Sequence, residues 1–353
     1  MDTLRLAIHA HELESEASRK ILKQAAEILR CGGTVAFPTE TVYGLGANAL
    51  NSGAIAKIFV AKQRPSWDPL IVHISDTEML RHVTTNLPPN AVKLMDAFWP
   101  GPLTLLLPKS EAIPDAVTAG RPRVGVRMPQ HPIAHALVQA AGIPIAAPSA
   151  NRFGRTSPTT AAHVMEDLDQ RIDAILDAGE TTHGLESTVV DACEEPCVIY
   201  RPGVISIEQI HAAGVDAVMF RESTETRQAA PESLPSPGVG LRHYAPKAKL
   251  ILIDGTGTAQ IAAFSQAVSH AQQNGETPGL MLADAFEEAV RHHRVLVYPW
   301  GRWEDPEQLA QRLFAGLRYL DHAGATVIVC PLPAARGIGM AMRDRLHKAA
   351  RVE

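Results

Sequence analysis

Short apolar runs that end at proline or glycine recur along the first part of the chain, and they most constrain its fold. Apolar and β-branched residues between such turn residues favour extended chain. The runs cover residues 34–37, 70–74, 103–107, 124–127, 143–147, 174–176, 187–190 and 198–200. Helical spacing of apolar residues occurs between them, at 17–29, 52–61, 91–98, 133–141 and 161–168. We predict an α/β domain with a curved, mixed sheet over residues 1–210.

The composition changes over residues 221–246, RESTETRQAAPESLPSPGVGLRHYAP, which are rich in proline and have little apolar periodicity. Such a segment is typical of a linker. Its last part contains Arg242, His243 and Tyr244, side chains that suit a partner surface better than a free tether.

A regular alternation of strands and helices follows the linker. Strand patterns at 250–253, 279–282, 295–298 and 326–330 alternate with helical patterns at 259–273, 285–292, 306–321 and 338–350. This alternation is typical of a parallel sheet with helices on both faces. We predict a second domain over residues 247–353, with a small, doubly wound, Rossmann-like parallel sheet.

Length, charge and cysteine content exclude several classes of protein. A chain of 353 residues is too long for one ordinary core, which agrees with two domains. No run approaches ~20 apolar residues, and the charged N-terminus lacks an apolar signal core, so we expect neither membrane insertion nor secretion. Four cysteines are too few for a disulfide framework and indicate a reducing cytoplasm. The net charge of −5 argues against a standing nucleic-acid binder.

Common cofactor and metal motifs are missing. No P-loop pattern occurs, and Gly44-Leu45-Gly46 lacks the third glycine of a dinucleotide fingerprint. Cys193 and Cys197 have no second pair, and His131 and His135 lack the glutamate of a zinc-protease helix. The sequence therefore predicts neither a dinucleotide site nor a zinc site.

Polar and cationic groups nevertheless gather where the predicted strands end. Guanidinium and ammonium groups bind phosphate or carboxylate, and hydroxyls and amides orient a ligand, so such a set suits an anion. The set comprises the segment 38–46 (PTETVYGLG), Lys62, Arg64, Arg121, Arg123, Arg127, the segment 148–151 (PSAN), Ser157, Ser187, Thr188 and Arg201.

Each member of this set also has a purely structural interpretation. A Lys-x-Arg pair is commonly a solvated surface pair, and Ser149-x-Asn151 after a strand is commonly a helix N-cap. Gly44 and Gly46 would then only form a turn, and His73 would be a hydrogen-bonded, half-buried histidine. The combination favours a ligand site over these alternatives.

The combination resembles the YrdC/Sua5 family. Lys62-x-Arg64 with Ser149-x-Asn151 is similar to the paired signature of that family. PTETVYGLGA, Pro69-Leu70 with His73, VGVRMP, STVVD and RPG follow in the order of the family. The later SPG…RHYAP and GIGMAMRDRLHKAA resemble the two-domain Sua5 type. The resemblance implies a YrdC-like catalytic domain (1–210) around a concave pocket, a linker that acts as an active-site lid (221–246) and a Sua5 C-terminal domain (247–353).

The resemblance implies L-threonylcarbamoyladenylate synthase activity, which is that of a nucleotidyltransferase. L-threonine, bicarbonate or CO2 and ATP would give threonylcarbamoyl-AMP and pyrophosphate. A separate transferase complex would pass the threonylcarbamoyl group to tRNAs that read A-starting codons. Mg²⁺ is expected with ATP, through phosphate oxygens and water, and no organic cofactor is expected. Direct tRNA binding is expected to be weak or absent.

The resemblance also assigns roles by position. Arg127 is the natural partner of the threonine carboxylate, and Tyr244 is favoured over His243 as the residue that covers the pocket. Arg123 departs from the Ser or Thr that is usual in the family, and it would contact phosphate or solvent. The catalytic residues implied are Lys62, Arg64, Ser149 and Asn151, which also bind ATP together with Ser157, Arg201, His243 and Tyr244. The implied threonine pocket comprises Thr41, His73, Arg127, Ala147 (through its backbone) and Ser187.

Two other functions remain open from the sequence. One is an RNA-binding module, against which the acidic charge and the 5% aromatic content argue. The other is a carbamoyl-adenylating enzyme of the hydrogenase-maturation type. Such proteins are expected to carry zinc-finger and acylphosphatase segments, and the sequence has no CxxC pair.

Overall fold

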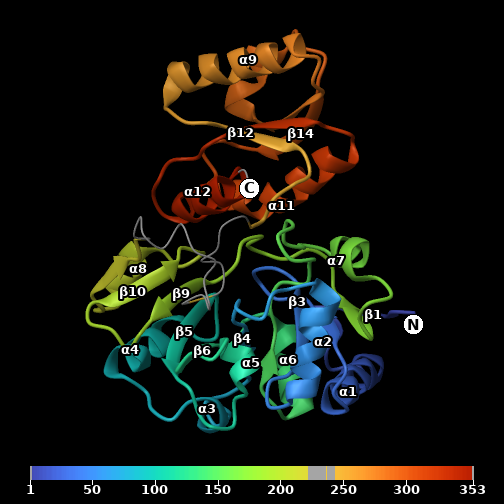
Figure 1. Cartoon of the computed structure of the whole chain (residues 1–353), viewed down its shortest axis with the longest axis vertical. Coiled ribbons are helices and arrows are strands. Elements are labelled where there is room, and N and C mark those ends of the chain that lie inside the picture. Colours follow the sequence, from blue (N-terminus) through green and yellow to red (C-terminus); the bar gives the residue numbers. More distant parts are fainter. Residues whose placement is uncertain (1, 222–235, 237–242, 352–353) are drawn as a thin grey trace. The chain divides into compact units, whose positions relative to one another are not determined.

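The computed structural model describes residues 2–221, 236 and 243–351, which form two compact units (Figure 1). The first unit comprises Met1–Phe153, Pro158–Thr182 and Glu186–Val239. The second comprises Gly154–Ser157, His183–Leu185 and Gly240–Glu353. Most of the predicted linker lies outside the described residues. The predicted domain boundaries at residues 210, 221 and 247 therefore stay a prediction.

A large mixed sheet forms the centre of the first unit. Its order is β1-β8-β2-β3-β7-β4-β6-β5-β9-β10-β11. The sheet contains parallel pairs, such as β4 with β6, and antiparallel pairs, such as β5 with β6. The predicted mixed sheet is thus confirmed. Its strands are β1 (Leu4–Ala7), β2 (Val35–Phe37), β3 (Gly44–Asn48), β4 (Ile71–His73), β5 (Leu103–Pro108), β6 (Arg123–Arg127), β7 (Ile145–Ala146), β8 (Ala174–Asp177), β9 (Thr188–Asp191), β10 (Cys197–Arg201) and β11 (Ala217–Met219).

Helices cover this sheet and bury two separate apolar clusters. Helices α1 and α6, side by side in Figure 1, bury one cluster with Val35 and Phe37 of β2. Ala36, between them in sequence, belongs to the other cluster, because side chains alternate across a strand. The helices are α1 (Glu16–Arg30), α2 (Ser52–Lys62), α3 (Leu80–Val83), α4 (Pro89–Phe98), α5 (Asp115–Thr118), α6 (Pro132–Ala141), α7 (Ala161–Leu168) and α8 (Ile207–Ala212).

Side-chain caps explain where several predicted helices begin. Ser15 accepts from the amide of Ser18 before α1, and Thr160 accepts from the amide of His163 before α7. Asn51 accepts from two amides before α2. Each cap satisfies amides that the first turn of a helix leaves without intrahelical partners.

Strand β3 differs from the turn that Gly44 and Gly46 suggested. Both glycines lie in the sheet, where Gly44 pairs with Phe37 and Gly46 with Val35 of β2. A Cβ on Gly46 would lie 2.7 Å from Phe37 Cε1 and 2.8 Å from Ile145 Cγ2. Glycine is therefore needed at this position for packing between strands, and the interpretation as a turn is wrong.

The second unit contains a parallel sheet of order β12-β15-β13-β14. The predicted parallel α/β architecture is confirmed, although the helix predicted at 285–292 is shorter and follows a 3₁₀ turn at Asp284–Phe286. The strands are β12 (Lys249–Ile253), β13 (Pro278–Ala283), β14 (Leu296–Gly301) and β15 (Val327–Pro331). The helices are α9 (Gly257–Gln273), α10 (Glu287–Val290), α11 (Pro306–His322) and α12 (Ile338–Ala349).

Two further observations concern the helices and the cysteines of both units. Within the described residues, each helix is too short or too polar to span a bilayer. The four cysteines are all free thiols, with Cys197 and Cys330 buried and Cys31 exposed.

Candidate active site

The central strands of the large sheet carry polar side chains on the face opposite one apolar cluster. Val72, Leu105 and Val126 belong to the cluster that also contains α2 residues. Because strands alternate, the neighbouring His73 and Arg127 point to the opposite face. Both are buried, with 4% of their surface exposed. Strands β4 and β6 are parallel and pair His73 with Arg127, so these two residues lie side by side.

A β-bulge brings Arg201 to the same face. Ile199 pairs with Val190, and both belong to the apolar cluster. Regular alternation would place Arg201 on that side as well, but the register shifts between Ile199 and Arg201, and Arg201 pairs with Val189. A bulge re-aims the side chain that follows it. Arg201 therefore lies on the polar face.

Arg127 is held by three groups around its guanidinium. Its Nη2 lies 2.6 Å from Glu40 Oε1, and its Nη1 donates to Thr41 Oγ1 at 2.9 Å. Its Nε donates to the carbonyl oxygen of Gly101 at 3.2 Å. The loop after β2 thus supplies a carboxylate and a hydroxyl that fix the orientation of Arg127.

His73 is a neutral, buried histidine. Burial, together with the nearby charge of Arg127, lowers the pKa of His73 to about 3. Its ring contacts the Phe37 ring edge-on, at a centroid distance of 6.0 Å. Among the described residues, Nδ1 of His73 has no hydrogen-bond partner. His73 is thus more buried than the half-buried histidine of the structural interpretation, and hydrogen bonds with the backbone of Ile71 and Ile145 still act on it.

Lys62 joins the two halves of the predicted signature. Its ammonium donates to the carbonyl oxygen of Ser149 at 2.5 Å and also to that of Asn151. The Ser149 hydroxyl donates to Asn151 Oδ1 at 2.6 Å. The interpretation of Ser149-x-Asn151 as a helix N-cap is wrong, because no helix begins there.

Arg64 lies beside Lys62 and is equally buried. Arg64 Nη2 is 2.9 Å from Asp68 Oδ2 and donates to the carbonyl oxygen of Pro69 at 2.8 Å. Burial and the charge of Arg64 hold the pKa of Lys62 well below its ordinary value. Burial raises the pKa of Asp68 against the opposing charges of Arg64, Lys62 and Arg201. The Lys-x-Arg pair is thus a buried cationic pair, and its interpretation as a solvated surface pair is wrong.

Ser187 and Arg201 form a third group with Thr104. The Ser187 hydroxyl is 2.8 Å from that of Thr104, and Arg201 donates to Ser187 Oγ and to its carbonyl oxygen, each at 3.1 Å. Because Arg201 also acts on the pKa of Asp68, this group lies within electrostatic reach of Lys62 and Arg64. Ala147 follows β7, and its amide donates to the carbonyl oxygen of Ile71 at 2.8 Å.

The remaining predicted residues, Ser157, His243 and Tyr244, belong to the second unit. Tyr244 is 1% exposed, has a φ of +63° and stacks on Phe314 at 5.7 Å. The Arg345 guanidinium lies over the ring of Tyr244, 5.1 Å from the ring centroid. Tyr244 is thus fixed to α11 and α12 of its own unit.

Arg123 contacts carboxylates at the other end of β6. It pairs with the buried Asp191, and its Nη2 lies 2.6 Å from Glu194 Oε1. These partners give Arg123 a structural role at the β9–β10 hairpin. They argue against both expectations for this residue, a phosphate contact and a purely solvent-directed side chain.

Sequence reasoning missed two buried carboxylates in this region, Glu40 and Asp68. Glu40 lies inside the PTETVYGLGA motif, and Asp68 follows Arg64 by four residues. The signal was available in both cases, because buried arginines require a counter-charge. Neither carboxylate stands out in the sequence, because acidic residues next to turns are common on protein surfaces.

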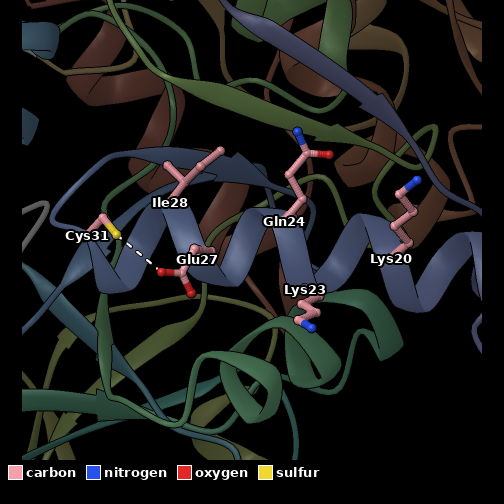
Figure 2. Close-up of a pocket in the computed structure, with 6 residues that line it drawn as sticks. All are labelled: Lys20, Lys23, Gln24, Glu27, Ile28 and Cys31. Carbon is pink, nitrogen blue, oxygen red and sulfur yellow. Dashed lines mark hydrogen bonds between the residues drawn. The ribbon is translucent and has the colours of Figure 1, made fainter.

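A pocket of about 780 Å³ lies elsewhere in the first unit, along α1. Figure 2 shows its lining residues, which come from successive turns of this helix. The Cys31 thiol donates a hydrogen bond to Glu27 Oε1 at 3.3 Å, and this contact raises the pKa of the thiol. A thiol that resists ionisation is a poor nucleophile. The pocket is lined by Lys20, Lys23, Gln24, Glu27, Ile28 and Cys31, and includes no predicted site residue.

Comparisons with known proteins account for nearly the whole chain. A family model described as "Telomere recombination" (Sua5_yciO_yrdC) matches residues 27–203, and one described as "Threonylcarbamoyl-AMP synthase, C-terminal domain" matches residues 205–351. A threonylcarbamoyl-AMP synthase of Pyrococcus abyssi is 40% identical over 333 residues, which cover 93% of this chain and 94% of the relative. The chain belongs to the threonylcarbamoyl-AMP synthase family. This confirms the predicted family and its two-domain type.

Other relatives agree with this membership. A threonylcarbamoyl-AMP synthase of Bacillus subtilis is 42% identical over 330 residues, covering 93% of this chain and 92% of the relative. The crystal structure of P. abyssi Sua5 complexed with L-threonine has a TM-score of 0.87 at 37% identity, covering 99% of this chain and 98% of that one. A variant of the same protein, with a histidine and a tyrosine replaced by alanine, has a TM-score of 0.89, 37% identity and coverage of 99% and 96%.

Proposed function

We propose that this chain forms threonylcarbamoyl-AMP and pyrophosphate from L-threonine, bicarbonate or CO2, and ATP. Similarity to threonylcarbamoyl-AMP synthases over more than nine-tenths of both chains carries this proposal. The chain is thus an enzyme of a family whose activity belongs to tRNA modification. The buried cations and hydroxyls of the first unit supply the groups that this chemistry needs.

The threonine pocket is the first part of the proposal. A guanidinium binds a carboxylate through two parallel hydrogen bonds, and Arg127 is the cation of the group around His73 and Thr41. The neutral His73 would pair with a polar group of threonine through Nδ1. Ser187 would add a hydroxyl. Ala147 would contribute its carbonyl oxygen, because its amide is engaged by Ile71.

The phosphate site is the second part. Lys62 has three ammonium donors, of which two contact Ser149 and Asn151, so the third would bind a phosphate oxygen. Arg64 and Arg201 would add positive charge, which stabilises the developing charge on the α-phosphoryl group. Ser149 and Asn151 would close the same side of the site.

The chemistry then requires positioning more than a protein nucleophile. The threonine ammonium loses one proton, the resulting amine attacks the carbon of CO2, and loss of a second proton from its nitrogen leaves a carbamate. A carbamate oxygen attacks the α-phosphorus of ATP, and the bond to pyrophosphate breaks. Carbamate and mixed anhydride both hydrolyse readily, so the site must exclude water. The burial of Lys62, Arg64, Arg127 and His73 supports such exclusion.

Mg²⁺ would accompany ATP. The described residues contain no cluster of three or more histidine, cysteine or acidic side chains that would hold a metal ion. Asp68 is a single carboxylate already paired with Arg64, so it does not fit a magnesium site. When bound with ATP, Mg²⁺ would neutralise phosphate charge through phosphate oxygens and water.

The linker and the second unit complete the proposal. Ser157, His243 and Tyr244 would contact ATP, and the segment 221–246 would act as a lid that shields the intermediate. Deleting residues 236–246 should increase release of free threonylcarbamoyl-AMP per ATP consumed, measured by quenching and chromatography. Unchanged release would contradict the lid.

Hand-off and location follow from the product. A mixed anhydride that hydrolyses readily would be passed to a transferase that modifies tRNA, and such a transfer favours a location in the cytoplasm. RNA as the main ligand is disfavoured by the net charge of −5. Filter binding to tRNA at increasing salt tests this point, because phosphate contacts give a steep salt dependence.

Pyrophosphate release tests the reaction itself. The assay contains ATP, Mg²⁺ and bicarbonate, with threonine, serine or no amino acid. We expect release that requires threonine and bicarbonate, with serine a poor substitute. Release that does not depend on threonine, or no release, would contradict the proposal.

A further inference from the structure

Glu40 is a buried carboxylate that the proposed chemistry does not use. Its exposed fraction is 4%, and it lies in the loop after β2 between Thr39 and Thr41. Oε1 lies 2.6 Å from Arg127 Nη2 and accepts from the amide of Gln130 at 3.2 Å. Oε2 faces the amide of His131 at 3.4 Å. One carboxylate therefore links Arg127 to the amino end of α6.

This contact differs from an ordinary stabilising ion pair. Replacing a buried pair with apolar residues commonly costs no stability, so burial alone does not explain why the charge is present. Burial opposes the ionisation of Glu40, but the charge and hydrogen bond of Arg127 outweigh it and lower the pKa of the carboxyl. The amino end of a helix also favours negative charge. Glu40 is thus held as an anion against the guanidinium of Arg127.

The loop fixes the rest of the guanidinium as well. Thr41 accepts from Arg127 Nη1, and the Thr41 hydroxyl is itself 2.8 Å from that of Thr39. Thr39 donates to the carbonyl oxygen of Val42 at 2.7 Å, which ties the side chains to the loop backbone. An arginine side chain loses rotamer entropy when it is ordered, and here the side chain is ordered by the protein itself.

We propose that Glu40 is a positioning residue, which holds the Arg127 guanidinium in the orientation that receives the threonine carboxylate. The inference rests on the proposed function, because it assumes that Arg127 binds threonine. Glu40 acts through Arg127 and contacts no reacting atom. It sets the affinity for threonine and leaves the phosphate site unchanged.

Glu40→Gln is the variant that isolates this role. The amide has nearly the shape of the carboxylate but accepts hydrogen bonds at one oxygen only. It cannot serve Arg127 and the amides of both Gln130 and His131, since its NH2 group faces a donor in either orientation. We expect the KM for threonine to rise about tenfold, with kcat and the KM for ATP within twofold of wild type.

Asp191→Asn is the matched control. It removes a buried carboxylate from Arg123, which lies on the same strand as Arg127 and four residues before it. We expect a lower melting temperature for this variant, with an unchanged KM for threonine. An equal rise in the KM for threonine in both variants would overturn the proposal, because it would reflect general weakening of β6.

A double-mutant cycle separates positioning from a simple charge effect. On an Arg127→Lys background, Glu40→Gln should change the KM for threonine less than twofold, because an ammonium has no fork to orient. Equal effects on both backgrounds would overturn the proposal, and so would a KM for threonine that stays the same or falls in the single variant. If Glu40→Gln is too unstable to assay, Glu40→Asp retains the charge at a shorter reach and should raise the KM for threonine in the same selective way.

Failure of the proposed function can be distinguished from failure of the role proposed for Glu40. Wild-type protein that shows neither threonine-dependent pyrophosphate release nor calorimetric binding of threonine would contradict the proposed function, and the role of Glu40 with it. Active wild-type protein with an unaffected Glu40→Gln variant would overturn the role of Glu40 alone.

Discussion

Arg64 and Asp68 form an ion pair inside the first unit, with Nη2 and Oδ2 2.9 Å apart and both side chains almost fully buried. Asp68 lies within electrostatic reach of Lys62 and Arg201 as well. The buried Asp167 also lies within electrostatic reach of Lys62. Buried guanidinium and ammonium groups of this kind suit an anionic ligand such as a polyphosphate.

Asp68→Asn should destabilise the protein but increase its response to ATP. Removing one partner of a buried pair leaves an uncompensated charge, so we expect the free energy of unfolding to fall by about 3 kcal/mol. Phosphate charge would restore part of this loss. The shift in melting temperature on adding ATP and Mg²⁺ should therefore be larger in the variant than in wild type.

A surface pair provides the control for this experiment. Asp115 lies 2.6 Å from Lys109 but is 79% exposed, so Asp115→Asn should change stability by less than about 1 kcal/mol. Its response to ATP should match that of wild type. Equal ATP-induced shifts in Asp68→Asn and wild type would show that Asp68 does not balance a phosphate site.

Lys62→Met should abolish most of the activity while keeping the fold. Methionine fills a similar volume, and it removes the buried ammonium group of Lys62, whose pKa is lowered by burial. Loss of one preorganised donor to a transition state typically costs about 100-fold or more in rate. Pyrophosphate release measures the loss, and circular dichroism checks the fold.

Lys57 offers a matched comparison on the same helix. It lies on α2 as Lys62 does, but it is exposed. Lys57→Met should retain the activity of wild type. An active Lys62→Met variant, or one that does not fold, would refute a catalytic role for Lys62.

His73 should make the protein less stable in mild acid. Its pKa of about 3 in the folded chain lies below the ordinary value of about 6.5, so the unfolded chain binds the proton more tightly. Stability from neutral His73 is present above pH 6.5 and is lost as the pH falls. Between pH 7 and pH 5, we expect His73 to remove about 2 kcal/mol from the free energy of unfolding.

Urea denaturation at several pH values tests this expectation. His73→Gln should flatten the dependence on pH, whereas replacing the exposed His82 by Gln should leave it as in wild type. His131 also has a lowered pKa through burial and contributes in the same direction, so some dependence will remain. An unchanged slope in His73→Gln would contradict a neutral, buried His73.

Tyr244 should stabilise the second unit through its ring. The ring stacks on Phe314 and lies beneath the Arg345 guanidinium, so Tyr244→Ala should cost about 3 kcal/mol. Tyr319, which is 52% exposed and packs on Tyr298, is a suitable comparison and should cost about 1 kcal/mol when replaced by alanine. Hydrogen exchange in α11 and α12 measures the effect. Equal protection in both variants would contradict the anchoring role.

Local patterns in the sequence predicted much of the fold. Apolar runs bounded by turn residues identified β5 and β6 closely, and helical spacing of apolar residues identified α1. Strand β3 was missed because its glycines are typical of turns, and their presence reflects close packing of Phe37 and Ile145. Strand β1 was missed because an edge strand of only four residues gives little periodic signal.

The candidate site was predictable in its residue types but not in its geometry. The cations Lys62 and Arg127 could be identified from sequence, whereas their partners come from long-range contacts. The carbonyl groups that bind Lys62 belong to Ser149 and Asn151, almost ninety residues away along the chain. The bulge that re-aims Arg201 also depends on pairing with β9, which no local pattern reports.

The second unit includes two short segments, Gly154–Ser157 and His183–Leu185, that lie in sequence between segments of the first unit. Gly154 accepts from the amide of Ala245, and Thr156 accepts from Arg318 at 2.5 Å. At Gly184, a Cβ would lie 2.4 Å from the carbonyl oxygen of Gln311, so that loop needs glycine. A fragment that starts after the linker would lack these partners. A C-terminal fragment that is to keep these contacts must therefore also carry residues 154–157 and 183–185, which the chain reaches before the linker.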